Sequence, residues 1–495
     1  MIAANLPALQ VIIPLLAAPL ALMLRRGSLS HLLALLVSAI TLLISYTLLQ
    51  SVLADGPISY EMGGWAPPWG IEYYVDAVNA FVLLIVSAIG TVVMLAAGSS
   101  VAAEISQEKQ SMFFTAYLLC LAGLLGITIT GDAFNVFVFL EISSLSTYVL
   151  ISIGRDRRAL TASLQYLMMG TIGATFILIG VGLLYMTTGT LNMHDLAVRL
   201  DLLTESRTVQ AAFAFLAVGT SLKLALFPLH LWLPNAYTYA PSIASAFLAA
   251  TATKVAVYVM LRFFFTIFGV QFSFDIMPLG TVLLVLAILA IFAGSLSAIY
   301  QDNVKRLLAY SSVAQIGYIM LGISFATQAG LTAAILHLFN HAMMKGGLFL
   351  ALAAVFYSTG GTSMANFRGL GKTMPWTMMA IVLGGLSLIG VPLTAGFVSK
   401  WYLVLAALEQ GWWPVALAVL AASLLAVIYI WKLVEAAYFQ IPEAEAAAVK
   451  EAPLTLLIPT WILISANIYF GIDTSLTVEV AQTAATSLLG TGGLF

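Results

Sequence analysis

The chain has 495 residues, of which 62% are hydrophobic and 8% are charged, whereas about 25% of the residues of an ordinary soluble domain are charged. This composition predicts a protein that lies in a lipid bilayer, without a folded domain outside it. The net charge of -2, with no cluster of basic residues, excludes the electrostatic footprint of a nucleic-acid-binding protein. The one cysteine, Cys120, cannot supply the several thiolates of an iron–sulfur cluster, so we expect no cofactor in this chain.

Apolar runs of about 20 residues, long enough to cross a hydrocarbon core, follow one another along the whole chain. In the first run, MIAANLPALQVIIPLLAAPLALMLRR, the positive charge comes after the apolar stretch, the reverse of a cleavable signal peptide. We therefore predict an all-α polytopic membrane protein with about fourteen transmembrane helices in a single membrane domain, residues 1–495. The predicted spans start near Asn5, Ser30, Val75, Met112, Ala133, Thr161, Thr208, Ile243, Ile276, Lys305, Leu331, Pro375, Trp413 and Pro453.

Basic residues in the loops fix the expected orientation, because short cytoplasmic loops carry an excess of Lys and Arg. Most of them fall in alternate loops: Arg25, Arg26, Lys109, Arg155, Arg157, Arg158, Lys305, Arg306, Arg368, Lys372 and Lys450. The other set of loops holds Arg199, Arg207 and, at the end of a span, Arg262. We predict a multi-pass protein of the bacterial inner membrane with both termini on the periplasmic side. A merged or split span would change this assignment.

The sequence contains a weak internal repeat. The stretch GDAFNVFVFLEISSLSTYVL at 131–150 can be laid on QDNVKRLLAYSSVAQIGYIM at 301–320, which places Glu141 opposite Ser311. Five spans separate the paired stretches. Because five is an odd number, the two halves are expected to have opposite orientations in the membrane.

Each half also has a proline inside an apolar span, Pro228 in LKLALFPLHLWLPNA and Pro392 in LSLIGVPLTAGFVSK. Proline removes a backbone hydrogen bond, and a freed carbonyl at membrane depth must be satisfied by protein or water. Inverted repeats with discontinuous helices are a transporter architecture. We predict two inverted five-helix repeats with broken helices, residues 112–268 (spans 4–8) and 276–438 (spans 9–13). Taken alone, the prolines fit simple packing kinks equally well.

The first half carries a candidate proton switch. Glu141 lies in FNVFVFLEISSLSTY, with Ser144 and Tyr148 three and seven residues later on about the same helical face. Lys223 precedes Pro228 by five residues. Burial disfavours a charged lysine and a nearby carboxylate favours it, so a Glu that approaches and leaves a buried Lys can switch its protonation. The structural alternative for Glu141 is a buried neutral acid held by a hydroxyl.

The central part of the chain carries basic groups inside spans. Lys254 has no acid on its own helix, and HLFNHAMMKGG places His337, His341 and Lys345 at successive spacings of four, on one helical stripe. A charge at mid-bilayer costs about 2.5 to 3.5 kcal/mol and usually marks an ion path. No carboxylate or cysteine joins the histidines on this helix, so we predict a proton relay rather than a metal site.

Two basic residues follow the proline breaks. His230 comes two residues after Pro228 and fits a channel mouth or a cytoplasmic loop equally well. Lys400 comes eight residues after Pro392, where we expect it to end a half-channel.

In combination, FLEISSLSTY, LKLALFPLHLWLPNAY, ATKVAVY, VKRLLAYSSVAQIGY, HLFNHAMMKGGLFL and GVPLTAGFVSKW resemble the antiporter-like, proton-translocating subunits shared by Mrp-type multisubunit Na+/H+ antiporters, complex I and membrane-bound hydrogenases. The resemblance covers almost the whole chain and implies fourteen helices with two inverted five-helix repeats. Within this family, GGWAPPWGIEYYVDAVNAF and a terminal Lys in place of Glu are most similar to the D subunit of Mrp-type antiporters. The proton path that the resemblance implies runs through Glu141, Lys223, Lys254, His337, His341 and Lys400.

We therefore predict a transport subunit, not an enzyme, that conducts protons in a multisubunit Na+/H+ antiporter. The expected partners are a homologous antiporter-like subunit, small membrane subunits, protons, Na+ if it passes through this chain, and the lipid bilayer. The alternatives are a proton-pumping subunit of a complex I-like or hydrogenase complex, a stand-alone solute transporter and a non-conducting spacer. A solute transporter would need a specific substrate pocket, and a spacer would have no need of buried lysines.

Overall fold

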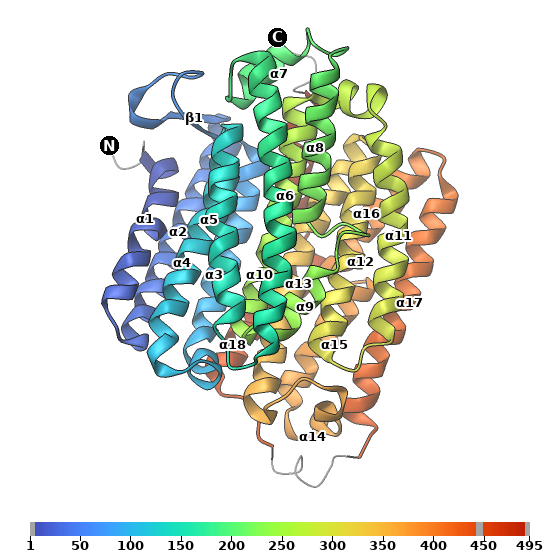
Figure 1. Ribbon diagram of the computed structural model, residues 1–495. Helices are drawn as coiled ribbons and strands as arrows, with labels where there is room; N and C mark the ends of the chain where they lie inside the picture. Colours follow the sequence, from blue (N-terminus) through green and yellow to red (C-terminus); the bar gives the residue numbers. More distant parts are fainter. Residues whose placement is uncertain (1–4, 442–448, 491–495) are drawn as a thin grey trace.

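The computed structural model describes residues 5–441 and 449–490, which form a bundle of roughly parallel helices (Figure 1). Within these residues, twelve helices are long and apolar enough to cross a membrane. The prediction of an all-α polytopic membrane protein is confirmed. The twelve helices are α1 (Leu6–Met23), α2 (Gly27–Asp55), α3 (Ala77–Glu104), α4 (Gln107–Ile129), α5 (Ala133–Ser152), α6 (Arg158–Thr188), α10 (Ser242–Leu261), α11 (Leu279–Ile299), α12 (Val304–Ser324), α13 (Gln328–Thr359), α17 (Trp413–Tyr438) and α18 (Leu454–Ile472).

Two predicted spans are interrupted. The span expected from Thr208 consists of α8 (Arg207–Lys223) and α9 (Trp232–Tyr239), and the span expected from Pro375 consists of α15 (Pro375–Ile389) and α16 (Ala395–Glu409). None of these four helices reaches the length of about 20 residues that a span needs. The count of fourteen therefore stays a prediction, which depends on counting each pair of short helices as one span.

The remaining elements lie at the ends of the bundle or continue its helices. They are β1 (Ile58–Glu61), β2 (Glu72–Val75), α7 (Met193–Leu200), α14 (Leu370–Thr373), α19 (Ser475–Gly490), the 3-10 turns η2 (Met62–Gly64) and η5 (Met364–Phe367), and the π-helical segments η3 (Arg262–Ile267) and η4 (Gln271–Ile276). Strands β1 and β2 pair antiparallel, with Ile58 opposite Val75. Figure 1 shows β1 and α7 at one end of the bundle and α14 at the other. We call these the hairpin end and the basic end.

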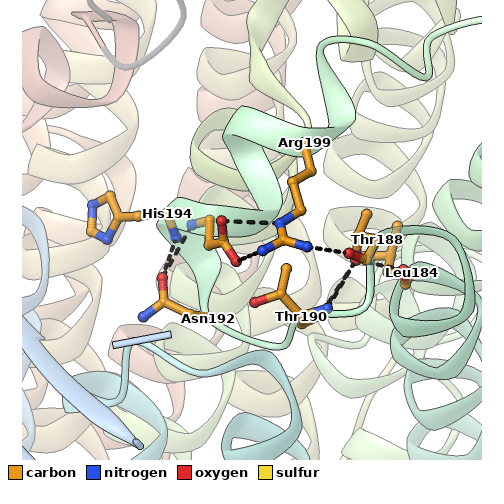
Figure 2. Close-up of polar contacts among 7 residues, drawn as sticks. Leu184, Thr188, Thr190, Asn192, His194 and Arg199 are labelled. Atoms are coloured by element: carbon orange, nitrogen blue, oxygen red, sulfur yellow. Dashed lines mark hydrogen bonds and ion pairs between the residues drawn. The ribbon is translucent and has the colours of Figure 1, made fainter. Parts of the chain in front are cut away.

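Helix α7 is fastened across the end of α6 (Figure 2). The Arg199 guanidinium donates to the Asp195 carboxylate at 2.9 Å and to the Thr188 carbonyl oxygen at 2.7 Å. Thr188 is the last residue of α6, so its carbonyl has no partner within the helix. The Asn192 side chain caps α7 by accepting from the backbone N–H groups of His194 and Asp195, at 3.0 and 3.1 Å.

Most of the basic residues lie at the basic end, where the starts of helices and the loops between them contact one another. Ser30, which follows Arg25 and Arg26, donates to Ser111 of α4 at 3.1 Å. Lys305 donates to the Ala240 carbonyl oxygen at 3.2 Å. The predicted alternation of basic and non-basic loops therefore corresponds to the two ends of the bundle. Which end faces the cytoplasm stays a prediction.

The prediction that Arg262 belongs with the loop residues is wrong. Arg262 begins η3, where its side chain is buried, and its Nη2 lies 2.6 Å from Asp76 Oδ1. Its Nε donates to the Tyr258 hydroxyl at 2.9 Å. Asp76 also caps α3 by accepting from the N–H groups of Val78 and Asn79. A buried charge needs such a partner, because without one its desolvation is strongly unfavourable.

Two isolated β-bridges match the proposed repeats. Asp132, just before α5, pairs with Asn192, and Asn303, just before α12, pairs with Ser363. The first pair lies at the hairpin end, beside α7, and the second at the basic end, beside η5. Equivalent contacts at opposite ends are what an inverted repeat produces. They support the assignment of residues 112–268 and 276–438 as repeats, which stays a prediction.

Candidate functional site

The basic residues that the sequence singled out lie inside the bundle and do not face its surface. The most exposed of the six, Lys223, has 8% of its surface accessible. All six are Lys223, Lys254, His337, His341, Lys345 and Lys400. The helices that carry four of them are themselves central, since 89% of the most apolar stretch of Ser242–Ile267 and 78% of that of α13 is buried. Ionisable groups in such positions mark an ion path by default.

The first helix break places Lys223 at the last position of α8. Beyond it, Ala225 has a φ of 59°, which is unusual for a residue with a side chain. At the break, the Leu222 carbonyl oxygen accepts from the Ala225 N–H at 3.3 Å and from the Trp232 indole N–H at 3.1 Å. Pro228 is exposed within the break. The break thus opens the helix at Lys223 without leaving the Leu222 carbonyl unsatisfied.

His230 lies in the same break, between α8 and α9. Its side chain is buried, and its Nδ1 has no hydrogen-bond partner in the described part of the chain. The ring stacks on Phe227 at 5.3 Å between centroids. His230 is therefore not in an exposed loop, and its free nitrogen suits a place at the mouth of the break.

Lys223 contacts α5 through a hydroxyl group. Its Nζ donates to Ser144 Oγ at 2.9 Å. Glu141 lies one turn before Ser144, and its Oε1 is buried with no hydrogen-bond partner among the described residues. In this structure Ser144, and not Glu141, is the hydrogen-bonding neighbour of Lys223. The hydroxyl separates the two members of the predicted switch.

A small space adjoins this contact. It is lined in part by Ser144, Thr220 and Lys223 and has a volume of about 30 Å³, which is more than the roughly 10 to 15 Å³ that one water needs. At Gly170, an added Cβ would come 2.2 Å from the Tyr148 hydroxyl oxygen and 3.6 Å from Lys223 Nζ. Gly170 therefore leaves room for the tyrosine and lysine to approach each other. The Tyr148 hydroxyl is buried and has no partner among the described residues.

Lys254 lies in the middle of the bundle, on α10. Its ammonium group donates to the carbonyl oxygen of Ala249 on the same helix. The structure records no ion pair for it within residues 5–441 and 449–490. Helix α10 packs against α13, which carries the two histidines. This packing places Lys254 between the two halves of the candidate path.

The histidine pair lies on α13, in two different environments. His337 Nδ1 is 2.8 Å from Ser399 Oγ, and its Nε2 is 2.8 Å from Gln315 Oε1. The His341 ring is nearly parallel to it, with 6.2 Å between centroids, and neither of its nitrogens has a partner in the described residues. One imidazole is thus held in place by two hydrogen bonds, whereas the other is buried with both nitrogens unpartnered among the described residues.

Lys345 continues the histidine stripe toward the basic end. Its Nζ donates to the Leu308 carbonyl oxygen at 2.7 Å and to Ser311 Oγ at 2.5 Å. Ser311 is the residue that the repeat places opposite Glu141. The second half therefore holds a Lys–Ser contact like that of Lys223 with Ser144, although its lysine comes from another helix.

Lys400 stabilises the second helix break. Its Nζ donates to the carbonyl oxygens of Leu388 and Ile389, at 2.9 and 3.0 Å, and to Ser423 Oγ at 3.1 Å. The two carbonyls belong to the last turn of α15, where the helix supplies no donor. Leu393 in this break has a φ of 70°, as Ala225 does in the first. Lys400 takes the place that Trp232 has there, so it has a structural role, and its role at the end of a half-channel stays a prediction.

The cluster around His337 and Lys400, which we call the second cluster, also contains residues that sequence reasoning missed. The Tyr318 ring lies 4.6 Å from Lys400 Nζ and 5.7 Å from the His337 ring. Together with Gln315, it connects the histidine to the lysine through α12. Both residues belong to VKRLLAYSSVAQIGY, where a glutamine within the apolar stretch VAQIG was the available signal. Pro392 is exposed in the break and contributes no polar group.

Comparison with known proteins relates the chain to membrane subunits of two kinds of complex. The model of a family described as "NADH:quinone oxidoreductase/Mrp antiporter, TM" matches residues 130–426. The chain is 42% identical over 475 residues to the N subunit of the NADH-quinone oxidoreductase of Desulforudis audaxviator, covering 93% of this chain and 94% of that protein. It is 33% identical over 392 residues to the D subunit of the Na(+)/H(+) antiporter of Alkalihalophilus pseudofirmus, covering 79% of this chain and 78% of that protein. A chain of the Mrp complex from a Dietzia species superimposes with a TM-score of 0.89 at 26% identity, with 100% of both chains covered.

Proposed function

Because the chain belongs to the NADH:quinone oxidoreductase/Mrp antiporter transmembrane family, we propose that it conducts protons as a subunit of a multisubunit monovalent cation/proton antiporter. Its family makes it an antiporter-like membrane subunit that works with other membrane subunits. The observation that carries the proposal is the series of buried basic groups on separate helices. All of them except His341 contact a hydroxyl, an amide or a backbone carbonyl, and His341 is buried with both ring nitrogens unpartnered among the described residues.

The proposed path has two halves that meet at Lys254. In the first half, a proton reaches Lys223 from the Glu141–Ser144 turn. When Glu141 turns toward Lys223, its charge favours the ammonium form, and when it turns away, burial favours the amine and releases the proton. In the second half, His337 and His341 pass the proton toward Lys400. The space beside Lys223 is large enough for the water that such a transfer needs.

We propose that the basic end faces the cytoplasm and that both termini face the periplasm. Short cytoplasmic loops carry the excess of Lys and Arg, and the loops that contain Arg25, Arg155 and Arg368 lie at that end. Labelling of single introduced cysteines with an impermeant reagent on intact cells tests this. Labelling at the basic end from outside the cell would reverse the orientation.

The second candidate is a proton-pumping subunit of a redox-driven complex. The 42% identity to the N subunit of an NADH-quinone oxidoreductase favours it, whereas the Lys at position 400 and the likeness to the D subunits of antiporters favour the first. The two differ in the driving force. In the antiporter a Na+ gradient moves protons, and in the redox complex electron transfer in partner subunits does so.

The deciding experiment purifies the native complex and supplies one driving force at a time. Membranes are solubilised mildly and separated by blue-native electrophoresis, and the proteins that migrate with this chain are identified. The complex is then reconstituted, and proton uptake is measured after a Na+ jump or after addition of an electron donor. Proton uptake driven by sodium supports the antiporter. A chain that migrates alone and takes up an organic solute would reject both candidates.

A further inference from the structure

A second polar cavity opens at the hairpin end, away from Lys223. It lies between the start of α13, the end of α16 and α19, and has a volume of about 620 Å³. Since one water needs only about 10 to 15 Å³ by this measure, the cavity has room for a hydrated ion. We call it the α13–α16–α19 cavity.

The charge of this cavity is negative. Its lining includes two carboxylates, Glu409 of α16 and Glu479 of α19, and no Lys, Arg or His. Both glutamates are exposed, and the structure records no ion pair for either within residues 5–441 and 449–490. The other polar lining groups are amides and hydroxyls, which solvate cations through their oxygens. Carboxylates in a low-dielectric hollow raise the local concentration of cations.

An unpaired hydroxyl marks the wall of the cavity on α13. Thr332 is 2% exposed and lines the cavity, yet its Oγ1 has no hydrogen-bond partner among the described residues. Leaving a buried hydroxyl unsatisfied costs about 1 to 3 kcal/mol. A water or a cation in the cavity removes this cost.

The same wall leads to the second cluster of buried basic groups. Thr332 precedes His337 by five residues on α13, and Tyr402, also in the lining, follows Lys400 by two residues on α16. Five residues of α-helix rise about 7.5 Å. The cavity therefore approaches the His337–Lys400 cluster from the hairpin end.

We propose that the α13–α16–α19 cavity is a cation-collecting mouth, which concentrates small hydrated monovalent cations, Na+ or hydronium, beside the second half of the path. The link to the path rests on the proposed function, whereas the accumulation of cations does not. Glu409 and Glu479 supply the field, and Thr332 coordinates the innermost water or ion. In this role the glutamates position the cation and take no part in proton transfer along the helices.

Thiol modification of the assembled complex tests the cavity independently of transport. The one native cysteine of this chain, Cys120, is fully buried, so an introduced cysteine can be followed by mass spectrometry of the isolated chain. Thr483→Cys places a thiol on the cavity wall. Met186→Cys, at a residue 78% exposed near the same end, is the control. Each is treated with a cationic and an anionic methanethiosulfonate of similar size.

At Thr483→Cys, the ratio of the cationic to the anionic rate is expected to exceed the ratio at Met186→Cys by about tenfold, because two nearby negative charges attract one reagent and repel the other. Adding Glu409→Gln and Glu479→Gln together should return the ratio to the control value. Slower cationic labelling in NaCl than in choline chloride identifies Na+ as the occupant, and slowing by acid alone identifies hydronium. A ratio equal to the control, or one that the glutamines leave unchanged, overturns the proposal.

Proton uptake then tests the link to the path. The glutamine pair is expected to lower uptake several-fold at a normal yield of complex, whereas Glu205→Gln, an exposed acid elsewhere at the hairpin end, should leave it unchanged. If the labelling ratio falls as expected and uptake stays normal, the cavity attracts cations but is not the mouth of the path. If uptake is also insensitive to Lys223→Ala, the proposed function fails and the labelling result still stands.

Discussion

Replacing Ser144 by Ala is expected to slow proton uptake without affecting assembly. The Ser144 hydroxyl is the hydrogen-bond partner of Lys223, at 2.9 Å. A hydrogen bond to a charged group contributes about 1.5 to 3 kcal/mol. If this stabilises the transferring state of Lys223, its loss slows the step by about 10- to 150-fold, since about 1.4 kcal/mol is a factor of ten. A water that enters the 30 Å³ space beside Lys223 would replace part of the lost hydrogen bond, so the rate would fall by a factor nearer to 10.

The assay is proton uptake by proteoliposomes that contain the purified complex, with a pH-sensitive dye inside. Ser143→Ala is the matched control, because Ser143 lies on the same helix, lines the same space and donates instead to the Leu140 carbonyl oxygen at 2.9 Å. It should keep nearly the wild-type rate, and Ser144→Thr, which retains a hydroxyl, should recover part of the loss. Equal rates for Ser143→Ala and Ser144→Ala would refute the reasoning.

Three further predictions follow from contacts elsewhere in the structure. Lys400→Gln keeps an N–H donor for the freed carbonyls of α15 but has no proton to transfer, so the complex should assemble and lose proton uptake. Lys400→Leu should lower the yield of the complex as well. Equal yields of the two variants would show that Lys400 does not hold the break. Gln315→Leu leaves His337 Nε2 without its partner at 2.8 Å, so proton uptake should fall several-fold. A normal rate of uptake would count against a role of the His337 imidazole in proton transfer. Burial is the main cause that lowers the pKa of His194 in α7, so the folded state favours neutral His194, and stability is lost as pH falls below the unfolded value of about 6.5. Protease cleavage of the segment around α7 should therefore accelerate more between pH 7.5 and 5.5 in the wild type than in His194→Gln, and identical behaviour of the two would contradict this.

Sequence reasoning located the helix breaks because proline acts locally. Pro228 and Pro392 lie between short helices, as the missing N–H of proline requires. What the sequence did not reveal is how the freed carbonyls are satisfied. At the first break Trp232 donates to a carbonyl ten residues away in the sequence. At the second break Lys400 donates to carbonyls eleven and twelve residues away. The basic residue beyond Pro392 was correctly placed beside the break, but its part in holding the break together was not foreseen.

Partners far apart in the chain were the least predictable. Arg262 pairs with Asp76, which is 186 residues away in the sequence, and nothing in the local pattern of either residue indicates the other. The apolar run that ends at Arg262 reads as the end of a span, which is why a loop position was expected there. Asp76 lies in the motif GGWAPPWGIEYYVDAVNAF, but the sequence analysis assigned neither a role nor a partner to it.

The predicted switch stays a prediction, although the structure brings part of its residues together. Ser144 and Lys223 line one small space, whereas Glu141 and Tyr148, on the same helix as Ser144, do not belong to its lining. Direct pairing of Glu141 with Lys223 is absent from the described contacts, and the hydroxyl of Ser144 stands in its place. Helical periodicity places residues on a face, but which of two polar neighbours meets a lysine depends on packing between helices.

The most direct test of the account is proton uptake by the assembled complex with Glu141→Ala or Lys223→Ala. Both variants should assemble with their partner subunits in normal yield, because the helices that surround this site are held by other contacts. Each should lose nearly all proton uptake, since one member of the switch cannot change its protonation without the other. Wild-type uptake by either variant in a fully assembled complex would contradict the claim that protons pass through these residues.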